Sequence, residues 1–519
     1  MNRSTPHETH GTHGNEPAGM PVSRRKLVTG VAGVSFASVA GCLTSDASGD
    51  APVRISLASD PTDGDWEAYG GVVPYHTPFH ETLTAAPADL QSVEPQLARE
   101  WETLDETTWR FSLRDDVSFH DGSELTASLA ADALAALLEA RPIGFTRLTP
   151  DSFTAVDEYE LEIETTQPEP ATPGNLAHPL MSLQHPAADE PVGTGPYVAE
   201  DVTPDRPVEA VRFDDYRGTV PEPTLVFEGV TDPRTRSLRL ESGETDVALD
   251  LPRGSYEELA ASDDLEVRTE TEPRTGMVMV NRYREATSDR DLRKALQYAV
   301  DQHELVEEVL DGVGEPARSP FSKTIPWSAH DELSAHTDTD RAREYLEASA
   351  YDGEELRFII DGDQSEQQLI AQEMQRRYDD LGIDVAIEQV ESAAFFSEYT
   401  GGEADLAFVE LGSINGAADY LVYVMYHSEG GDNVDQYESE GTGVVNPGEE
   451  VDELIERGDT AFDEDVKREA YREVQRRVMD DGVTIPIYYK DYVIGTGADV
   501  DGPDLHAIPH MTDWTTLST

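Results

Sequence analysis

The segment Ser23–Cys42 constrains this chain most, because it decides in which compartment the remainder folds. Arg24, Arg25 and Lys26 precede an uncharged run of 14 residues, Leu27 to Ala40, and Cys42 follows. A basic region, a short apolar run and small residues at the end are typical of an export signal. A bilayer span needs about 20 apolar residues. The paired arginines predict the twin-arginine route, which carries folded cargo.

Cys42 is the only cysteine in the chain, and Val39-Ala40-Gly41-Cys42 resembles a lipobox, in which the cysteine is lipidated after cleavage. The alternative is a plain signal peptide with an incidental cysteine. With lipidation, residues 1–42 are the signal and residues 43–52 a flexible linker. The mature protein then lies on the outer face of the cell membrane, held by its N-terminal lipid, without disulfides of its own.

The charge of the chain excludes one class of partner. The 105 acidic and 38 basic residues give a net charge of −67, which repels nucleic acid. A disordered acidic protein is excluded because 38% hydrophobic residues, with 20 Tyr and 14 Phe, can form a core. We therefore predict a salt-adapted surface and a halophilic archaeal source, since molar salt shortens the Debye length to about 3 Å. At this density of Asp and Glu, clusters of carboxylates arise by chance.

Apolar periodicity predicts a mixed α/β body from residue 53 onward. Helical spacing marks residues 126–139, 234–243, 367–381 and 467–479, and a long amphipathic helix is expected from its cap at Asp289 to Gly312. Strands are expected at 53–57, 109–113, 159–163, 277–280, 356–360, 385–387, 405–409 and 484–489. The segment Pro191–Tyr197, with two Gly and two Pro, suggests a rigid crossover between lobes.

Five segments, in this order, resemble the peptide- and nickel-binding family (family 5) of extracellular solute-binding proteins that serve ABC importers. They are EPQLAREWE, WRFSLRDDVSFHDGSELTA, PVGTGPY, the stretch from Asn281 through DLRKALQYAVDQHELVEEVLDG, and REAYREVQRRVMDDGVTIPIYY. The resemblance extends over residues 53–495. A lipid anchor at Cys42 agrees with it, because single-membrane organisms tether such receptors.

The resemblance implies an α/β fold of the two-lobe periplasmic-binding-protein type (type II), with crossover hinge strands and an extra inserted subdomain. Residues 53–75, 193–275 and 490–519 would form the first lobe, 76–192 the inserted subdomain and 276–489 the second lobe. The partners implied are an ABC permease and its ATPase, and a small solute. We expect a monomer that needs no cofactor and no bound metal, and that carries no catalytic residues.

The loop Glu410–Leu421 departs from the peptide-binding members. In those members an aspartate before a second-lobe helix pairs with the α-amino group of the ligand. Aligning Tyr420-Leu421 on the family's aromatic-Leu pair places Ser413 and Gly416 where acids are usual. Either Asp419 or Glu410 replaces that aspartate, or the ligand lacks a free amine; Asp419 alternatively caps the following helix. Asn415, in the same loop, is a further candidate.

Nickel-binding members hold a metal chelate with an arginine, aromatic residues and a histidine, and Arg141 and His427 fall near comparable places. Among the aromatic residues that could line a cleft are Tyr69, Tyr420 and Tyr423, although each such residue is more often part of a core. Tyr420, Tyr423 and His427 recur at i, i+3 and i+7, so one helix face could turn to the ligand.

The sequence thus predicts a substrate-binding lipoprotein of an ABC importer that captures peptides or similar solutes outside the cell. The alternative is a nickel-chelate-binding protein of the same class. A secreted hydrolase is a remote alternative that would need two cleft carboxylates at a defined separation. The chain contains neither a nucleophile elbow nor a phosphate-binding loop.

Overall fold

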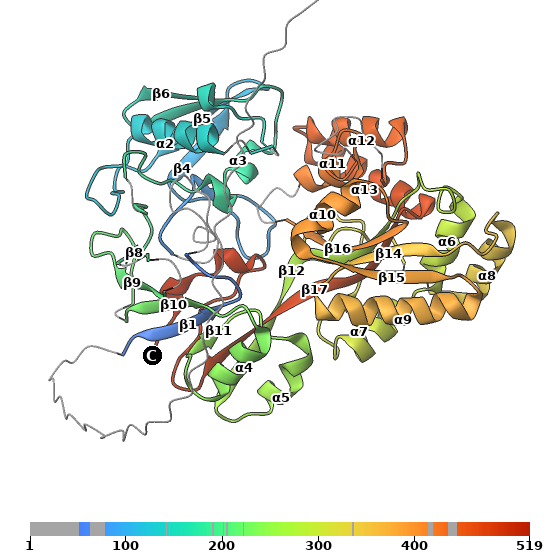
Figure 1. Cartoon of the computed structure of the whole chain (residues 1–519). Coiled ribbons are helices and arrows are strands. Elements are labelled where there is room, and N and C mark those ends of the chain that lie inside the picture. The colour runs from blue at the N-terminus through green and yellow to red at the C-terminus, as the bar shows by residue number, and fades with distance from the viewer. Residues whose placement is uncertain are drawn as a thin grey trace, which may run out of the picture. The chain divides into compact units, whose positions relative to one another are not determined.

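The computed structural model describes residues 51–62 and 78–519, except for 142, 145, 189–190, 201, 204–205, 222, 335–336, 414–418 and 434–443 (Figure 1). Cys42, Tyr69 and Asn415 lie outside the described residues. Within the described part of the chain, no helix has the length and apolar character to cross a membrane. The expected mixed α/β class is confirmed.

The strands are β1 (Val53–Leu57), β2 (Thr84–Ala85), β3 (Glu94–Pro95), β4 (Ala98–Thr103), β5 (Thr108–Leu113), β6 (Phe153–Asp157), β7 (Glu160–Glu164), β8 (Tyr197–Ala199), β9 (Val208–Arg212), β10 (Leu225–Gly229), β11 (Val247–Ala248), β12 (Leu265–Val280), β13 (Glu315–Pro316), β14 (Leu356–Asp361), β15 (Val385–Val390), β16 (Leu406–Gly412) and β17 (Thr484–Gly497). The helices are α2 (Ala127–Ala140), α3 (Thr172–Asn175), α4 (Pro233–Glu241), α5 (Tyr256–Ala260), α6 (Arg290–Ala299), α7 (Gln302–Val309), α8 (Thr339–Ala348), α9 (Ser365–Leu381), α10 (Ser392–Thr400), α11 (Asp419–Tyr426), α12 (Glu449–Asp459) and α13 (Glu464–Asp481).

One sheet of 11 strands joins both lobes through two long strands. Its order is β15-β14-β16-β12-β17-β11-β1-β10-β9-β8, with β13 on β17. One end of β12 pairs with both β16 and β17, and β17 continues to pair with β11 of the first lobe. The β12–β17 register shifts between Thr271 and Thr275. Such bulges bend a strand locally, so these two strands are the crossover strands of the fold.

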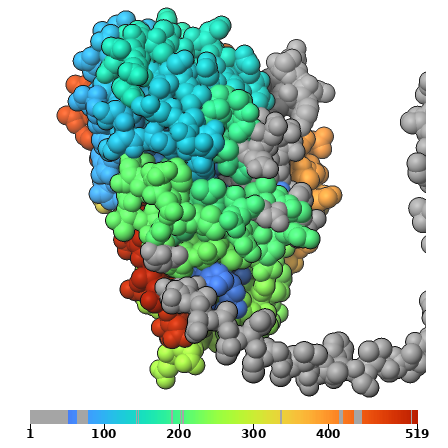
Figure 2. Space-filling view, turned by 90° about the vertical axis from the view of Figure 1, so that its left-hand side faces the viewer, coloured from blue at the N-terminus to red at the C-terminus, as the bar shows by residue number. Residues whose placement is uncertain are grey.

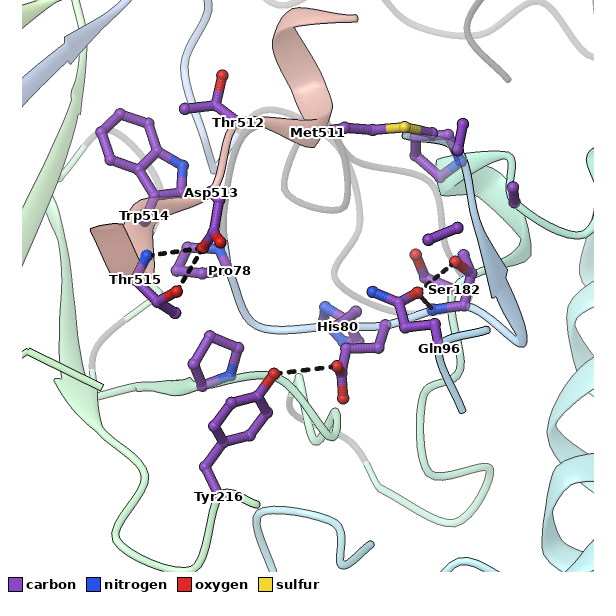
Figure 3. A pocket seen from close by; sticks show the side chains of 17 residues that line it. Pro78, His80, Gln96, Ser182, Tyr216, Met511, Thr512, Asp513, Trp514 and Thr515 are labelled. Atoms are coloured by element: carbon purple, nitrogen blue, oxygen red, sulfur yellow. Dashed lines mark hydrogen bonds between the residues drawn. The ribbon is translucent and has the colours of Figure 1, made fainter. Parts of the chain in front are cut away.

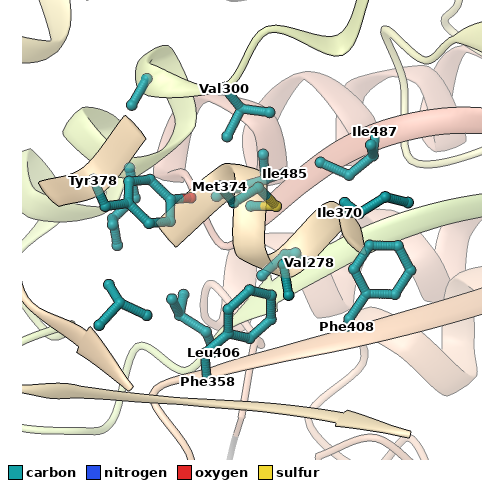
Figure 4. Packing of buried hydrophobic residues seen from close by; sticks show 14 of the residues in the cluster. Val278, Val300, Phe358, Ile370, Met374, Tyr378, Leu406, Phe408, Ile485 and Ile487 are labelled. Carbon is teal, nitrogen blue, oxygen red and sulfur yellow. The ribbon is translucent and has the colours of Figure 1, made fainter. Parts of the chain in front are cut away.

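Separate hydrophobic cores lie on either side of the crossover strands. One cluster gathers side chains from β1, β10 and β17 with Trp514. Two other clusters lie in the second lobe, and the one in Figure 4 packs α9 residues Ile370, Met374 and Tyr378 against Phe358 and Phe408 of the sheet. These clusters fall close to the expected lobe ranges, whose boundaries stay a prediction.

The inserted subdomain has its own sheet, β4-β5-β7-β6, and its own core under α2. Trp109, Phe111 and Leu113 of β5 point inward, as their alternation predicts. Thr126 begins α2 by accepting a hydrogen bond from the Leu129 N–H. Figure 2 shows this subdomain, in blue and cyan, adjoining the green residues of the first lobe.

The prediction of one long helix from Asp289 to Gly312 is wrong, because the structure has two helices there, α6 and α7. Asp289 caps α6 as expected, but the backbone is extended at Val300. Asp301 then caps α7 by accepting a hydrogen bond from the Glu304 N–H. The apolar spacing continues across the break because both helices bury one face against the same core.

The segment Pro191–Tyr197 does not cross between the two lobes, a function that β12 and β17 fulfil. It lies between the subdomain and β8 of the first lobe, where His120 Nε2 is 3.0 Å from the Gly195 carbonyl oxygen. A Cβ at Gly193 would lie 2.1 Å from the Phe79 carbonyl oxygen, and one at Gly195 2.2 Å from that of Pro78. The glycines therefore permit close backbone packing at this joint.

Candidate functional site

A cavity lies between the inserted subdomain and the second lobe; we call it the interlobe cavity. It encloses about 240 Å³. The subdomain supplies Gly144, Thr146, Arg147, Thr166, Glu169, Ala171 and Asn175, and the second lobe supplies Asp419, Tyr420, Tyr423, Val424 and Asp459. Because both parts contribute walls, a group held here contacts both at once.

The subdomain and the second lobe also touch each other directly. The Arg147 guanidinium forms an ion pair with the Asp459 carboxylate at the end of α12. Trp109 stacks on Phe462, with ring centroids 6.3 Å apart and an interplanar angle of 23°. Gln91 Nε2 donates to the Thr324 carbonyl oxygen at 3.2 Å. These contacts hold the two walls together without a ligand.

Asp419, the predicted ligand acid, is buried at the start of α11 and already has partners. Lys467 Nζ lies 2.9 Å from its Oδ2, and Trp327 Nε1 donates to its Oδ1 at 2.9 Å. Burial by itself lowers the pKa of Lys467, but the negative charges of Asp419 and Glu464 together outweigh it and the pKa is raised. Burial also raises the pKa of Asp419, although Lys467 and Trp327 act to lower it. Asp419 is therefore a buried carboxylate whose cationic partner comes from α13.

Glu410, the other acid considered as a substitute, is also engaged. The Tyr488 hydroxyl donates to it, and Lys490 Nζ lies 3.3 Å and Arg253 Nη2 3.7 Å away. Burial alone would raise the pKa of Glu410, but the positive charges of Lys490 and Arg253 lower it to about 2. Glu410 is thus part of an ion network on the crossover strands.

The structure brings some of the other candidates together. Tyr420 and Tyr423 line the interlobe cavity with Asp419. His427 is buried and stacks on Tyr423 at 4.2 Å, and its Nδ1 accepts a hydrogen bond from the Glu429 N–H at 3.0 Å. Ser413 is buried after β16, where its N–H donates to the Pro273 carbonyl oxygen. Neither His427 nor Ser413 is among the residues that line the cavity.

Arg141 is exposed at the C-terminal end of α2 and does not line the cavity either, whereas Arg147 of the following loop does. Sequence reasoning missed Arg147, Glu169, Asn175 and Asp459. The only signal for Glu169 in the sequence is its position between Pro168 and Pro170 in a Pro-rich loop, which does not set it apart from the many other acids of the chain.

Glu169 is the least compensated acid of the cavity. Its side chain accepts hydrogen bonds from Asn175 Nδ2 at 3.0 Å, from the Thr172 hydroxyl at 3.3 Å and from the Arg147 backbone N–H at 3.4 Å. Burial raises the pKa of Glu169 to about 7, against the lowering effect of Arg147. A carboxyl with this pKa exchanges its proton near neutral pH.

A second cavity, of about 300 Å³, is shown in Figure 3. The first lobe, the subdomain and the C-terminal segment Met511–Thr515 line it, and none of the described second-lobe residues contributes. Glu81 accepts a hydrogen bond there from the Tyr216 hydroxyl at 3.2 Å and pairs with Arg217. Burial and the neighbouring His120 lower the pKa of His80 to about 3, so His80 is neutral.

The fold and the cavity between its parts define a two-lobe solute-binding protein. The family model for bacterial extracellular solute-binding proteins, family 5 (Middle), matches residues 92–433. The chain belongs to this family of ABC-transporter solute-binding proteins, whose members bind solutes and are not enzymes.

Named relatives share about a quarter of their aligned residues with this chain, between 23% and 27%. The nickel-binding protein NikA of Staphylococcus aureus is 24% identical over 83% of this chain and 88% of its own length. The probable D,D-dipeptide-binding periplasmic protein DdpA of Escherichia coli is 23% identical over 87% of this chain and 89% of its own.

Solved structures agree in fold. The crystal structure of Staphylococcus aureus NikA in complex with Ni(L-His)2 has a TM-score of 0.74 at 23% identity, covering 89% of this chain and 99% of its own. The Bacillus subtilis oligopeptide-binding protein AppA, in complex with a nonapeptide, has a TM-score of 0.72 at 17% identity, covering 90% of this chain and 98% of its own.

Proposed function

We propose that this protein captures short peptides, or solutes of similar chemistry, and presents them to an ABC permease, and that the interlobe cavity holds one end of the ligand. The observation that carries the proposal is the composition of that cavity, to which both the subdomain and the second lobe contribute charged side chains. A ligand that contacts both walls favours the closed arrangement over the open one, and this difference is what a permease can sense.

The size of the cavity limits what it can hold. Complete sites for drug-sized ligands enclose about 300–1,000 Å³. At about 240 Å³ the interlobe cavity suits a terminal group of a longer solute. The relatives include proteins named for dipeptides and tripeptides as well as for nickel.

A nickel chelate is the second candidate. Two relatives are named as nickel-binding proteins, and Arg147 brings a guanidinium to the cavity beside Tyr420 and Tyr423. A guanidinium binds carboxylates in a bidentate manner, so it could receive the carboxylate of a chelating ligand. In this case the metal is cargo and its chelator supplies the ligands.

The N-terminal segment completes the proposal. Export by the twin-arginine route and acylation of Cys42 would hold the receptor at the outer face of the membrane, as a monomer, beside its permease and ATPase. The acidic surface would keep it soluble in the molar salt of a halophilic archaeon. The receptor itself would carry out no chemistry. Replacing Cys42 by Ser should move the exported protein from the membrane fraction to the medium.

The first test identifies what the purified protein carries. The exported chain is purified in molar KCl without denaturant, and the released solutes are analysed by mass spectrometry and for metals on the same sample. We expect short peptides near one per protein molecule. Stoichiometric nickel would contradict the peptide proposal and favour the chelate. A protein that carries nothing and retains neither added peptides nor added nickel–histidine would contradict both.

A further inference from the structure

The interlobe cavity has three carboxylates on its walls, and they differ in what neutralises them. Asp419 is paired with Lys467, and Asp459 is paired with Arg147. Among the described residues, Glu169 forms no ion pair. The Arg147 guanidinium is directed to Asp459 and Gln167, and only its backbone N–H reaches Glu169.

The donors around Glu169 are all neutral. An amide, a hydroxyl and a backbone N–H can satisfy carboxylate oxygens, but they do not compensate a full charge that is removed from water. A buried charge without a partner of opposite sign is costly, and the group titrates near neutral pH instead. An ammonium or guanidinium group entering the cavity would supply the missing charge.

Among the described residues, the charged side chains that line the cavity opposite Glu169 are Asp419 and Asp459. Asp459 of the second lobe is paired with the Arg147 guanidinium, and the Asp419–Lys467 pair is neutral as a whole. Burial raises the pKa of Tyr423 on this wall and of Tyr471 nearby, so these two hydroxyls stay protonated. The Tyr420 and Tyr423 rings on the opposite wall also suit a cation, because aromatic faces attract positive charge.

We infer that Glu169 of the inserted subdomain is the residue that receives a cationic group of the ligand, so that the cavity selects solutes with an ammonium or guanidinium group. The inference rests on the proposed function. It places the recognising carboxylate in the subdomain, across the cavity from Tyr420 and Tyr423 of the second lobe.

The test uses the full exported chain in molar KCl and three probes. These are a pool of di- and tripeptides with free amino termini, the same pool after N-acetylation, and Ni²⁺ with excess histidine. Solutes retained after rapid desalting are measured by mass spectrometry, and the affinity of a retained peptide by calorimetry. Glu169→Gln is compared with Glu164→Gln, an exposed glutamate of the same subdomain.

We expect the wild type to retain free-amine peptides, with acetylation weakening binding about tenfold or more, as for a lost charge-assisted hydrogen bond. Binding should also weaken about tenfold more between pH 8 and pH 6 in the wild type than in Glu169→Gln, because the carboxyl must lose its proton to bind a cation. The titration of the peptide amine is common to both proteins and cancels. Glu164→Gln should behave as the wild type.

Equal retention of acetylated and free peptides, or a pH dependence that survives in Glu169→Gln, would overturn the inference and leave the proposed function standing. Retention of nickel–histidine alone, unaffected by Glu169→Gln, would overturn the inference and would also contradict the peptide proposal in favour of the chelate. A folded wild type that retains none of the three probes would instead contradict the proposed function, and the inference with it. Thermal melting of both variants identifies any loss of folding.

Discussion

The acidic side chains on the two walls of the interlobe cavity differ in the partners that neutralise them. On the second-lobe wall, Asp419 is held by Lys467 of α13 and by Trp327, and its charge is used within the lobe. On the subdomain wall, Glu169 meets only neutral donors. An acid that is already paired supports its lobe, whereas an unpaired acid facing a cavity is available to a ligand. Burial alone therefore does not distinguish a structural carboxylate from a recognising one.

The largest effect should come from breaking the second-lobe pair. Asp419→Ala leaves the Lys467 ammonium buried without its partner, which typically costs about 3–5 kcal/mol of unfolding free energy. Urea unfolding in molar KCl measures it. Glu464→Ala removes the other carboxylate near Lys467, 3.5 Å away and 72% exposed, and should have little effect. If both variants were equally stable, Asp419 would not be a structural acid.

The pH dependence of Glu169 tests the other wall. Its folded-state pKa is raised from 4.5 to about 7 by burial, so the folded protein binds this proton more tightly than the unfolded chain does. The stabilisation is complete below about pH 4.5 and is lost as pH rises through 7, a change of about 3 kcal/mol. Glu169→Gln removes this change.

The difference in unfolding free energy between Glu169→Gln and the wild type should therefore shift in favour of the variant by about 3 kcal/mol from pH 4.5 to pH 8. Parallel urea titrations at several pH values measure it. Glu164→Gln provides the matched control, for which the difference should stay flat. A flat difference for Glu169→Gln as well would mean that Glu169 is compensated in the folded protein and that the two walls do not differ.

Most elements of the fold were predictable from the sequence, since alternation and helical spacing are local. Strand β5 and helices α9 and α13 agree with expectation within a few residues. Strands β12 and β17 extend well beyond their expected apolar ends. Their polar continuations, such as Arg268 and Asp491, pair across the two strands and so remain in the sheet. A pattern restricted to apolar runs misses residues that are held by strand pairing.

The site was predictable only in part. Tyr420, Tyr423 and Asp419 line a cavity, whereas their contact with a ligand stays a prediction. The pairing of Asp419 depends on Lys467, which lies on a different helix. Glu169 could not be distinguished from the many surface acids, because its burial arises only when the loop before α3 packs beside Arg147. Pairing and burial depend on tertiary contacts, which cannot be read from a single sequence.

The ion pair that joins the two walls should contribute less free energy than the buried interactions within either wall. Arg147 and Asp459 are 25% and 15% exposed at the side chain, so a double-mutant cycle with Arg147→Ala and Asp459→Ala should give a coupling of about 1 kcal/mol. The Arg110–Glu162 pair, which lies wholly within the subdomain sheet, serves as the control. Small-angle X-ray scattering should show opening for the first pair of variants only. Opening in the control pair, or none in either, would contradict a closing role.

The smallest effect should come from the stack of Trp109 and Phe462. The Trp109 ring is buried in the subdomain, whereas Phe462 comes from the second lobe and is 43% exposed. Phe462→Ala should weaken the contact between the subdomain and the second lobe by about 0.5–1.5 kcal/mol. Leu104→Ala, which removes an exposed apolar side chain of the subdomain, is the control.

If the stack belongs to lobe closure, Phe462→Ala should change the scattering profile while leaving the urea midpoint almost unchanged. A loss of global stability without opening would instead make the two walls one packed body, and a ligand could then enter only by local rearrangement at the cavity.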